Sequence, residues 1–267
     1  MSSFLETMRA SSRLRATQAT AAVSEARLRE QALAMPEPPP LSLHPHGFDV
    51  IAEFKRCSPA SGALRGDRRM MSVERTVQLY AKGGAAAVSV LTVPERFGGS
   101  LADMRAAAAA LRPFDVPVMR KDFIVDGAQI LEARVHGAGG VLLMLALLDD
   151  VNVTHLLETA FELGLFVLLE AFDAGELQRA ARLVDSHSAT GMLLVGLNAR
   201  DLRTLDVDAE RLVRLACHMP AGSAAVAESG VQGAEDAASM AAAGYRLILT
   251  GSALMRSDEP DLLVRSM

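Results

Sequence analysis

The stretch Leu193–Arg200, Leu-Leu-Val-Gly-Leu-Asn-Ala-Arg, is an apolar run that ends in an amide and a cation. Five other apolar runs also end in charged, amide or hydroxyl residues: 50–55, 117–122, 166–170, 224–230 and 247–252. A charge on a buried strand is costly unless it is paired or solvated. Six strands with polar carboxyl-terminal tips therefore predict one shared site. The fold that gathers many strand ends into one pocket is the (β/α)8 barrel.

Strand-like runs rich in Val, Leu, Ile and Ala recur eight times: 50–55, 86–91, 117–121, 140–145, 165–170, 193–198, 224–228 and 246–250. Each gap between them fits one helix and two short loops, which is typical of a parallel βαβ sheet. Helix starts are indicated by Ser72, Ser100 and the pair Asp173 and Glu176. The length of 267 residues also fits one such domain. The predicted fold class is α/β, a (β/α)8 TIM barrel with an N-terminal helical extension.

The chain before the first strand has a different composition. Residues 1–34 have a helical pattern, and the proline-rich segment 36–40 stiffens the approach to the first strand. We expect residues 1–47 to be an N-terminal helical extension with a Pro-rich linker, and 48–267 to be a single catalytic barrel. The extension could cap the barrel or lie across its mouth, and the sequence favours neither.

Composition argues against several classes of partner. The formal net charge is −5 and no Lys/Arg block is present, so we expect no nucleic-acid binding. No apolar run is long enough to span a membrane, and the N-terminus lacks the apolar core of a secretory signal, which predicts a cytoplasmic protein. There are two cysteines, and none of the six histidines lies at the end of a predicted strand, so we expect no metal site. We expect a monomer or weak homodimer.

Charged tips supply candidates for proton transfer. Glu53 and Lys55 lie two residues apart on one strand and so face the same side. Lys121 ends the third strand, and near other cations a partly desolvated lysine would have a lowered pKa and could act as an acid. Glu170 follows four apolar residues and is the candidate base. The alternative is that these groups form structural ion pairs at the barrel rim.

Two further strand tips indicate substrate-binding groups. Asn198 and Arg200 could orient a carboxylate or a hydroxyl-bearing chain. Ser229-Gly230 and Gly251-Ser252 follow the seventh and eighth strands, where barrels often bind phosphate through backbone N–H groups. Glycine is expected there because a Cβ would intrude on the phosphate or forbid the backbone angles. The predicted partner is a small-molecule phosphate ester.

Seven segments in order resemble the indole-3-glycerol phosphate synthase family: IAEFKRCSPASG, SVLTVPERFGGS, PVMRKDF, LLEAF, GLNARDL, VAESG and LTGSALM. The resemblance runs from about residue 48 to 256 and implies ring closure, with loss of carbon dioxide and water, of 1-(2-carboxyphenylamino)-1-deoxyribulose 5-phosphate in tryptophan biosynthesis. No cofactor is implied, because decarboxylation itself restores the aromatic ring.

The resemblance also implies a role for each motif residue. Lys121 would be the general acid at the keto group and Glu170 the general base. The remaining roles would be catalytic support from Glu53, Lys55 and Asn198, carboxylate binding by Ser58 and Arg200, phosphate binding by Ser229, Gly230, Gly251 and Ser252 with Lys55, and an aromatic-ring pocket formed by Phe123 and Leu142.

The chain departs from the family pattern at a few positions. Ala199 replaces Asn or Ser, Val93 an acidic residue, Arg96 an aromatic residue and Gly139 an aspartate, and the connection across 181–193 is longer. Val93 and Arg96 follow the second strand, at the active face, where they could change substrate affinity or loop closure.

Three other hypotheses stay open. A phosphate-binding barrel isomerase would also carry the phosphate loops, although it would need a catalytic Asp or Cys at other strand ends. A non-enzymatic paralogue would be expected to lose Lys121 or Glu170, and neither is lost. A specialised copy serving secondary metabolism would be chemically the same enzyme.

Overall fold

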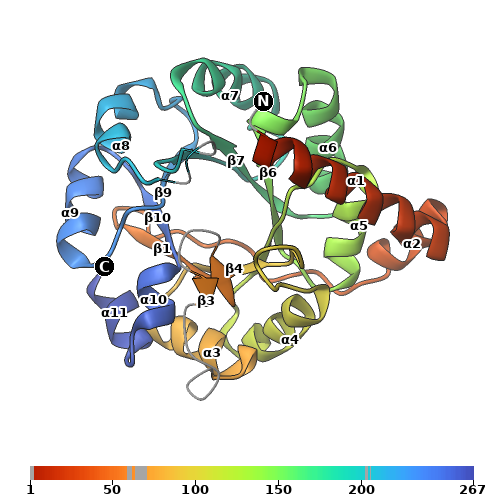
Figure 1. Cartoon of the computed structure of the whole chain (residues 1–267), viewed down its shortest axis with the longest axis horizontal. Coiled ribbons are helices and arrows are strands. Elements are labelled where there is room, and N and C mark those ends of the chain that lie inside the picture. The colour runs from red at the N-terminus through yellow and green to blue at the C-terminus, as the bar shows by residue number, and fades with distance from the viewer. Residues whose placement is uncertain (1–2, 59–61, 64–70, 202–203, 205) are drawn as a thin grey trace.

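The computed structural model describes residues 3–58, 62–63, 71–201, 204 and 206–267, and only the backbone of residues 3, 58, 62 and 63. Eight parallel strands close into a barrel in the order β1-β10-β9-β8-β7-β6-β5-β4 (Figure 1). They are β1 (Asp49–Phe54), β4 (Ala87–Leu91), β5 (Val118–Lys121), β6 (Gly140–Met144), β7 (Phe166–Ala171), β8 (Leu193–Asn198), β9 (Ala224–Glu228) and β10 (Leu247–Thr250). The predicted barrel is confirmed, and each predicted strand end lies within one residue of the observed end.

The strands are apolar because both of their faces are covered. Every residue of β1, β4, β6, β7 and β8 is buried. The register then brings the polar tips to one level, since Glu170 pairs with Gly196 and Asn198 pairs with Glu228. The local sequence therefore determines where the strands form, and the register of the strands places their polar end residues close together.

Helices surround the barrel and begin where capping residues predict. The side chains of Ser72, Ser100 and Asp173 each accept a hydrogen bond from a backbone N–H in the first turn. The helices after β1 are α3 (Val73–Gly83), α4 (Leu101–Leu111), α5 (Gly127–Val135), α6 (Asp150–Glu162), α7 (Ala174–His187), α8 (Glu210–Leu215), α9 (Ala234–Ala242), α10 (Ser252–Arg256) and α11 (Pro260–Ser266).

Short elements add detail that the sequence did not predict. An antiparallel hairpin joins β2 (Cys57–Ser58) to β3 (Gly62–Ala63) after the first barrel strand. Among the described residues, three 3-10 turns follow helices or strands: η1 (Arg112–Phe114), η2 (Leu145–Leu147) and η3 (Ala216–His218). Helix α7 also continues past Leu183 to His187, so part of the longer connection is helical.

The N-terminal extension forms two helices, α1 (Ser3–Ala22) and α2 (Glu25–Leu33), which are separated at Ser24, the N-cap of α2. Figure 1 shows α1 on the near side of the barrel, beside the strand ends, and α2 beside α5. The linker then reaches the opposite end, where Arg134 donates to the carbonyl oxygens of Met35 and Pro36. Of the two placements considered, α1 lies at the mouth.

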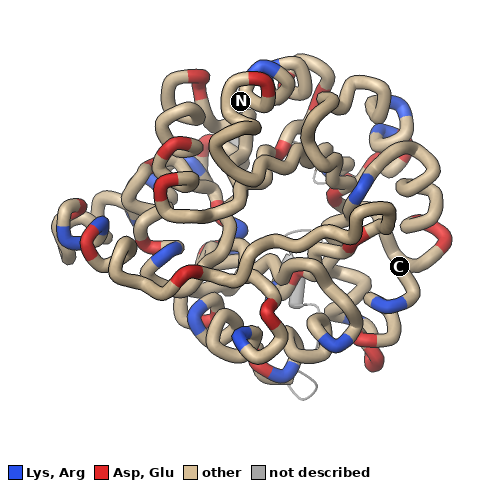
Figure 2. The backbone as a smooth tube through the Cα atoms, turned by 180° about the vertical axis from the view of Figure 1, so that it is seen from behind, with Lys and Arg blue, Asp and Glu red and all other residues tan. Residues whose placement is uncertain are grey.

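Charged residues of both signs are interspersed around the outside of the barrel (Figure 2). In the part of the chain that the structure describes, no helix is long and apolar enough to cross a membrane.

Candidate active site

A cavity of about 400 Å³ opens at the carboxyl ends of the strands. The side chain of Ser58 lies outside the described residues. Every other predicted site residue lines this cavity: Glu53, Lys55, Lys121, Phe123, Leu142, Glu170, Asn198, Arg200, Ser229, Gly230, Gly251 and Ser252. Residues separated by up to two hundred positions in the sequence therefore converge on one space.

Lys121 extends from the end of β5 into a group of carboxylates. Its Nζ lies 3.1 Å from Glu228 Oε2 and 3.5 Å from Glu170 Oε1. Burial lowers the pKa of Lys121, but Glu170, Glu228 and Glu53 together outweigh burial and raise it above its usual value. The prediction of a lowered pKa is wrong, because the neighbouring groups are mainly carboxylates. Lys121 is therefore a firmly protonated hydrogen-bond donor.

Glu53 and Lys55 form an ion pair along β1, as their two-residue spacing predicts. Burial alone would raise the pKa of Glu53, yet Lys55 and Lys121 lower it below its usual value. Glu53 is only 4% exposed, so an ionised carboxylate is fixed in the wall of the cavity. Two cations and their carboxylates thus form one connected charge cluster.

Asn198 orients the carboxylate of Glu170. Its Nδ2 donates to Glu170 Oε1 at 2.5 Å, and its Oδ1 accepts from the backbone N–H of Arg200 at 2.9 Å. Among the residues that the structure describes, the other oxygen, Glu170 Oε2, has no hydrogen-bond partner although it is buried. A buried carboxylate oxygen without a partner is costly in a resting protein. It is well suited to accept a proton from a bound molecule.

Glu228, at the end of β9, was not assigned a role from the sequence. Burial raises its pKa to about 8, and Lys121 only partly offsets this effect. Gly196 makes room for it, because a Cβ there would lie 2.1 Å from Glu228 Oε1. The signal that could have found it is its place behind four apolar residues, the same context that singled out Glu170.

The loops after β9 and β10 meet beside the carboxylates. Ser229 and Gly230 have positive φ values of 67° and 89°, so glycine is conformationally favoured at 230 as expected. Gly251 has φ of −139°, so of the two reasons expected for glycine the backbone angles do not apply there. Its glycine is required for space, since a Cβ would lie 2.5 Å from Glu53 Oε1. Gly251 therefore belongs to the packing of the charge cluster as well as to the loop.

The opposite wall of the cavity is apolar and aromatic. Phe123 and Leu142 are buried there, and the ring of Phe4 from α1 meets Phe123 edge to face at a centroid distance of 6.0 Å. Phe97 lies 6.3 Å from the same ring. The sequence did not predict Phe4 in the site, because nothing local to α1 indicates which surface it covers.

The departures from the family pattern fall into two groups. Val93 is buried in the cavity wall, and the Arg96 guanidinium lies 5.8 Å from the Phe4 ring, so this loop contacts α1. Gly139 lies at the opposite end of the barrel, where a Cβ would meet Pro117 at 2.9 Å and Pro38 at 3.3 Å. Its departure is therefore explained by packing against the linker.

No metal-binding arrangement was found among the described residues: they contain no group of three or more His, Cys, Asp or Glu side chains that could hold an ion. The charge cluster consists of two lysines, Lys55 and Lys121, and of carboxylates, and these are groups that can carry out proton transfer.

Comparisons with known proteins agree with this geometry. The family model described as indole-3-glycerol phosphate synthase matches residues 5–267. A protein of that name from Nocardioides sp. is 45% identical, covering 86% of this chain and 85% of its own. Another, from Mycobacterium tuberculosis, is 38% identical and covers 100% and 93%.

Solved structures show the likeness of fold alone. A mutant tryptophan synthase alpha-subunit from Pyrococcus furiosus superposes with a TM-score of 0.54 at 17% identity, covering 82% of this chain and 96% of its own. The sequence similarity extends across the whole barrel, and the motif residues line one cavity. Together these two findings identify the family. The chain belongs to the indole-3-glycerol phosphate synthase family.

Proposed function

We propose that this protein closes the indole ring in tryptophan biosynthesis. It converts 1-(2-carboxyphenylamino)-1-deoxyribulose 5-phosphate to indole-3-glycerol phosphate, with loss of carbon dioxide and water. The family match supports this activity. The observation that carries the assignment of roles is the position of Lys121 between Glu170 and Glu228, in a cavity with an aromatic wall and two Ser/Gly loops.

The first step forms the carbon–carbon bond. Lys121 donates its proton to the keto oxygen while the ring carbon bearing the carboxylate attacks the keto carbon. The bond to the carboxylate then breaks, carbon dioxide leaves, and its electron pair restores the aromatic ring. The raised pKa of Lys121 keeps the ammonium protonated until the substrate oxygen arrives to accept from it.

The second step removes water. The hydroxyl formed from the keto oxygen accepts a second proton from Lys121, which Glu228 has protonated again. Its carbon–oxygen bond then breaks, water leaves, and a base takes a proton from the methylene carbon beside the ring nitrogen. We assign this role to Glu170, because Asn198 holds one of its oxygens and the other has no partner among the described residues. Glu228 lies on the other side of the ammonium and can return a proton to Lys121, given that burial raises its pKa to about 8.

The remaining groups orient the substrate. Arg200 and Ser58 are assigned to the carboxylate, and Phe123 with Leu142 to the aromatic ring. The phosphate is assigned to backbone N–H groups of 229–230 and 251–252, with Lys55 nearby. This assignment is supported by the lining of the cavity, which includes all four of these residues, and by the positive φ at Gly230, which favours a residue without a Cβ.

The test is direct. Purified protein mixed with the carboxyphenylamino-deoxyribulose phosphate should generate the fluorescence of an indole product, without added cofactor. The dephosphorylated compound should react far more slowly, and inorganic phosphate should compete with the substrate. Isomerisation of a phosphorylated aminoaldose without indole formation would instead favour the barrel isomerase hypothesis.

We also propose that residues 48–267 form the catalytic barrel and residues 1–47 an extension with its linker, and that the protein is a cytoplasmic monomer or weak homodimer. Sedimentation at increasing protein concentration checks the oligomeric state. A stable tetramer would contradict it.

A further inference from the structure

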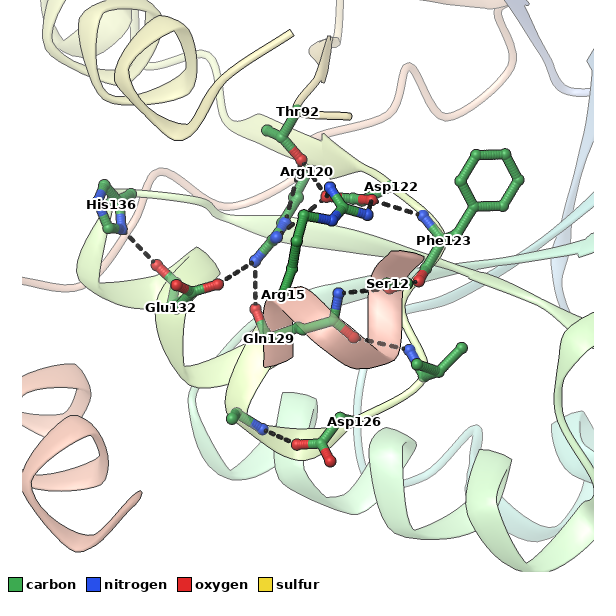
Figure 3. A network of polar contacts seen from close by, with 12 residues as sticks. Ser12, Arg15, Thr92, Arg120, Asp122, Phe123, Asp126, Gln129, Glu132 and His136 are labelled. Carbon is green, nitrogen blue, oxygen red and sulfur yellow. Dashed lines mark hydrogen bonds and ion pairs between the residues drawn. The ribbon is translucent and has the colours of Figure 1, made fainter. Parts of the chain in front are cut away.

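The end of β5 is held by a polar network that α1 completes (Figure 3). Asp122 is buried and accepts hydrogen bonds from Arg15 Nη2 at 2.8 Å, Thr92 Oγ1 at 2.6 Å and Arg120 Nη2 at 3.0 Å. Its Oδ1 also accepts from the backbone N–H of Phe123 at 2.8 Å. One carboxylate thus ties two strands and a helix to the turn that follows Lys121.

The peptide groups of Phe123 are held on both sides. Asp122 accepts from its N–H, and the hydroxyl of Ser12 on α1 donates to its carbonyl oxygen. Ser12 in turn accepts from Gln129 Nε2 at 2.9 Å, and Gln129 Oε1 accepts from the N–H of Val125 at 2.9 Å. The turn between β5 and α5 is therefore fixed from α1 and from α5 together.

The face of α1 that meets the barrel is apolar except for Ser12 and Arg15. Leu5, Met8 and Ala16 are buried along it, and Ser12 is fully buried among them. A buried hydroxyl is unfavourable unless it is hydrogen-bonded. Arg15 follows three residues later on the same side of the helix. Both polar groups of this face act on the same short turn.

The two cations of the network, Arg15 and Arg120, neutralise the two carboxylates, Asp122 and Glu132. Arg120 also donates to the carbonyl oxygen of Gln129 at 2.7 Å and lies 3.3 Å from Glu132. Arg15 is thus the second cation beside Asp122. Without Arg15, the group of Arg120, Asp122 and Glu132 would carry a net negative charge, centred on the residue that follows Lys121.

We propose that α1 positions the catalytic lysine and the aromatic wall of the site: Arg15 holds Asp122, Ser12 holds the peptide of Phe123, and together they set where the ammonium of Lys121 and the ring of Phe123 meet the substrate. Arg15 and Ser12 are positioning residues, and the inference rests on the proposed function. A displacement of about 1 Å at reacting groups can reduce a rate by about 10²-fold, so a small shift of this turn is enough to be measured.

The experiment compares Arg15→Met, Arg15→Lys and Ser12→Ala with the control Arg13→Met, which makes the same change on the exposed side of α1. The constants kcat and KM are measured with the carboxyphenylamino-deoxyribulose phosphate, well below each melting temperature and per folded protein. We expect Arg15→Met to lower kcat by about tenfold or more and Arg15→Lys to restore part of it, since a transition-state interaction is lost. Ser12→Ala should raise KM more than it lowers kcat. Arg13→Met should match the wild type.

A double-mutant cycle separates positioning from general stability. If Arg15 acts through Asp122, adding Arg15→Met to Asp122→Asn should lower kcat by less than twofold further, about the additivity error of such cycles. Independent, multiplying losses overturn the inference, as does an Arg15→Met variant with the kcat of Arg13→Met. Should Arg15→Met fail to fold, wild-type constants in both Arg15→Lys and Ser12→Ala overturn it. A wild type that forms no indole contradicts the proposed function and the inference together, whereas an active wild type with unaffected variants contradicts the inference alone.

Discussion

The two ends of the barrel hold their buried charges differently. At the amino end, Arg134 donates to the carbonyl oxygens of Leu163, Met35 and Pro36, which are neutral groups already placed by helix ends and the linker. At the carboxyl end, Lys121 lies among carboxylates, and oxygens of Glu170 and Glu228 have no partner among the described residues.

This difference separates stability from function. A buried cation whose donors are satisfied by fixed carbonyl oxygens leaves no open position for a ligand. A cluster with buried oxygens left unpaired is less stable than it could be, and those oxygens can accept hydrogen bonds or protons from a ligand. The barrel therefore has one end suited to stability and one end suited to chemistry.

The largest expected effect comes from substitutions of the proposed acid and base at the carboxyl end of the barrel. Lys121→Met and Glu170→Gln should each lower kcat by about 10²-fold or more, the usual contribution of a positioned proton-transfer group. Substrate affinity should change much less, because neither side chain is assigned to binding of the carboxylate, the aromatic ring or the phosphate. Steady-state kinetics with the carboxyphenylamino-deoxyribulose phosphate measure both constants. Wild-type kcat in either variant would show that the assigned role is wrong.

Substitution of the two loop glycines, Gly251 and Gly230, should change different kinetic constants. Gly251→Ala places a Cβ against Glu53 and should lower kcat by about tenfold through displacement of that carboxylate. Gly230→Ala strains a backbone with φ of 89° and should mainly raise KM, by moving the proposed phosphate-binding N–H groups. The split between kcat and KM is the measurement. Identical changes in both variants would remove the distinction between packing and phosphate binding.

A smaller effect tests the amino end. Arg134→Met leaves carbonyl oxygens without their donor and should cost about 1–3 kcal/mol. For a chain of this size that corresponds to roughly 2–4 °C in melting temperature per kcal/mol. The value of kcat per folded molecule should stay within about twofold of the wild type, because no transition-state contact is touched. A large loss of kcat would mean that this end also contributes to catalysis.

The smallest expected effect concerns Glu228 and pH. Its pKa is raised from 4.5 to about 8, so the folded state favours its protonated form. The stability that this group contributes is full below about pH 4.5 and is lost as pH rises toward about 8. Glu228→Gln removes this dependence, and its melting temperature relative to the wild type should therefore rise between pH 5 and pH 8. A difference that stays constant across this range would contradict the buried, proton-binding role of Glu228.

The sequence predicted what local chemistry determines. Alternation of apolar runs with capping residues such as Ser72 and Ser100 located the strands and helices, and the polar strand tips indicated side chains that line one cavity. It did not predict properties that depend on distant neighbours. The pKa of Lys121 rises because Glu170 and Glu228 come from other strands, and Phe4 enters the cavity from a helix whose docking surface no local pattern reveals.

The contacts of the N-terminal extension also have a consequence for biosynthesis of the chain. Ser12 is bonded 111 positions ahead, to Phe123, and Arg134 reaches 99 positions back, to Met35. Translation proceeds at about 5–20 residues per second, so α1 leaves the ribosome several seconds before its partners exist. During that interval the apolar face with Leu5 and Met8 has no docking surface on its own chain. Helix α1 can therefore dock only after residues 122–129 have been made, and until then its apolar face stays exposed.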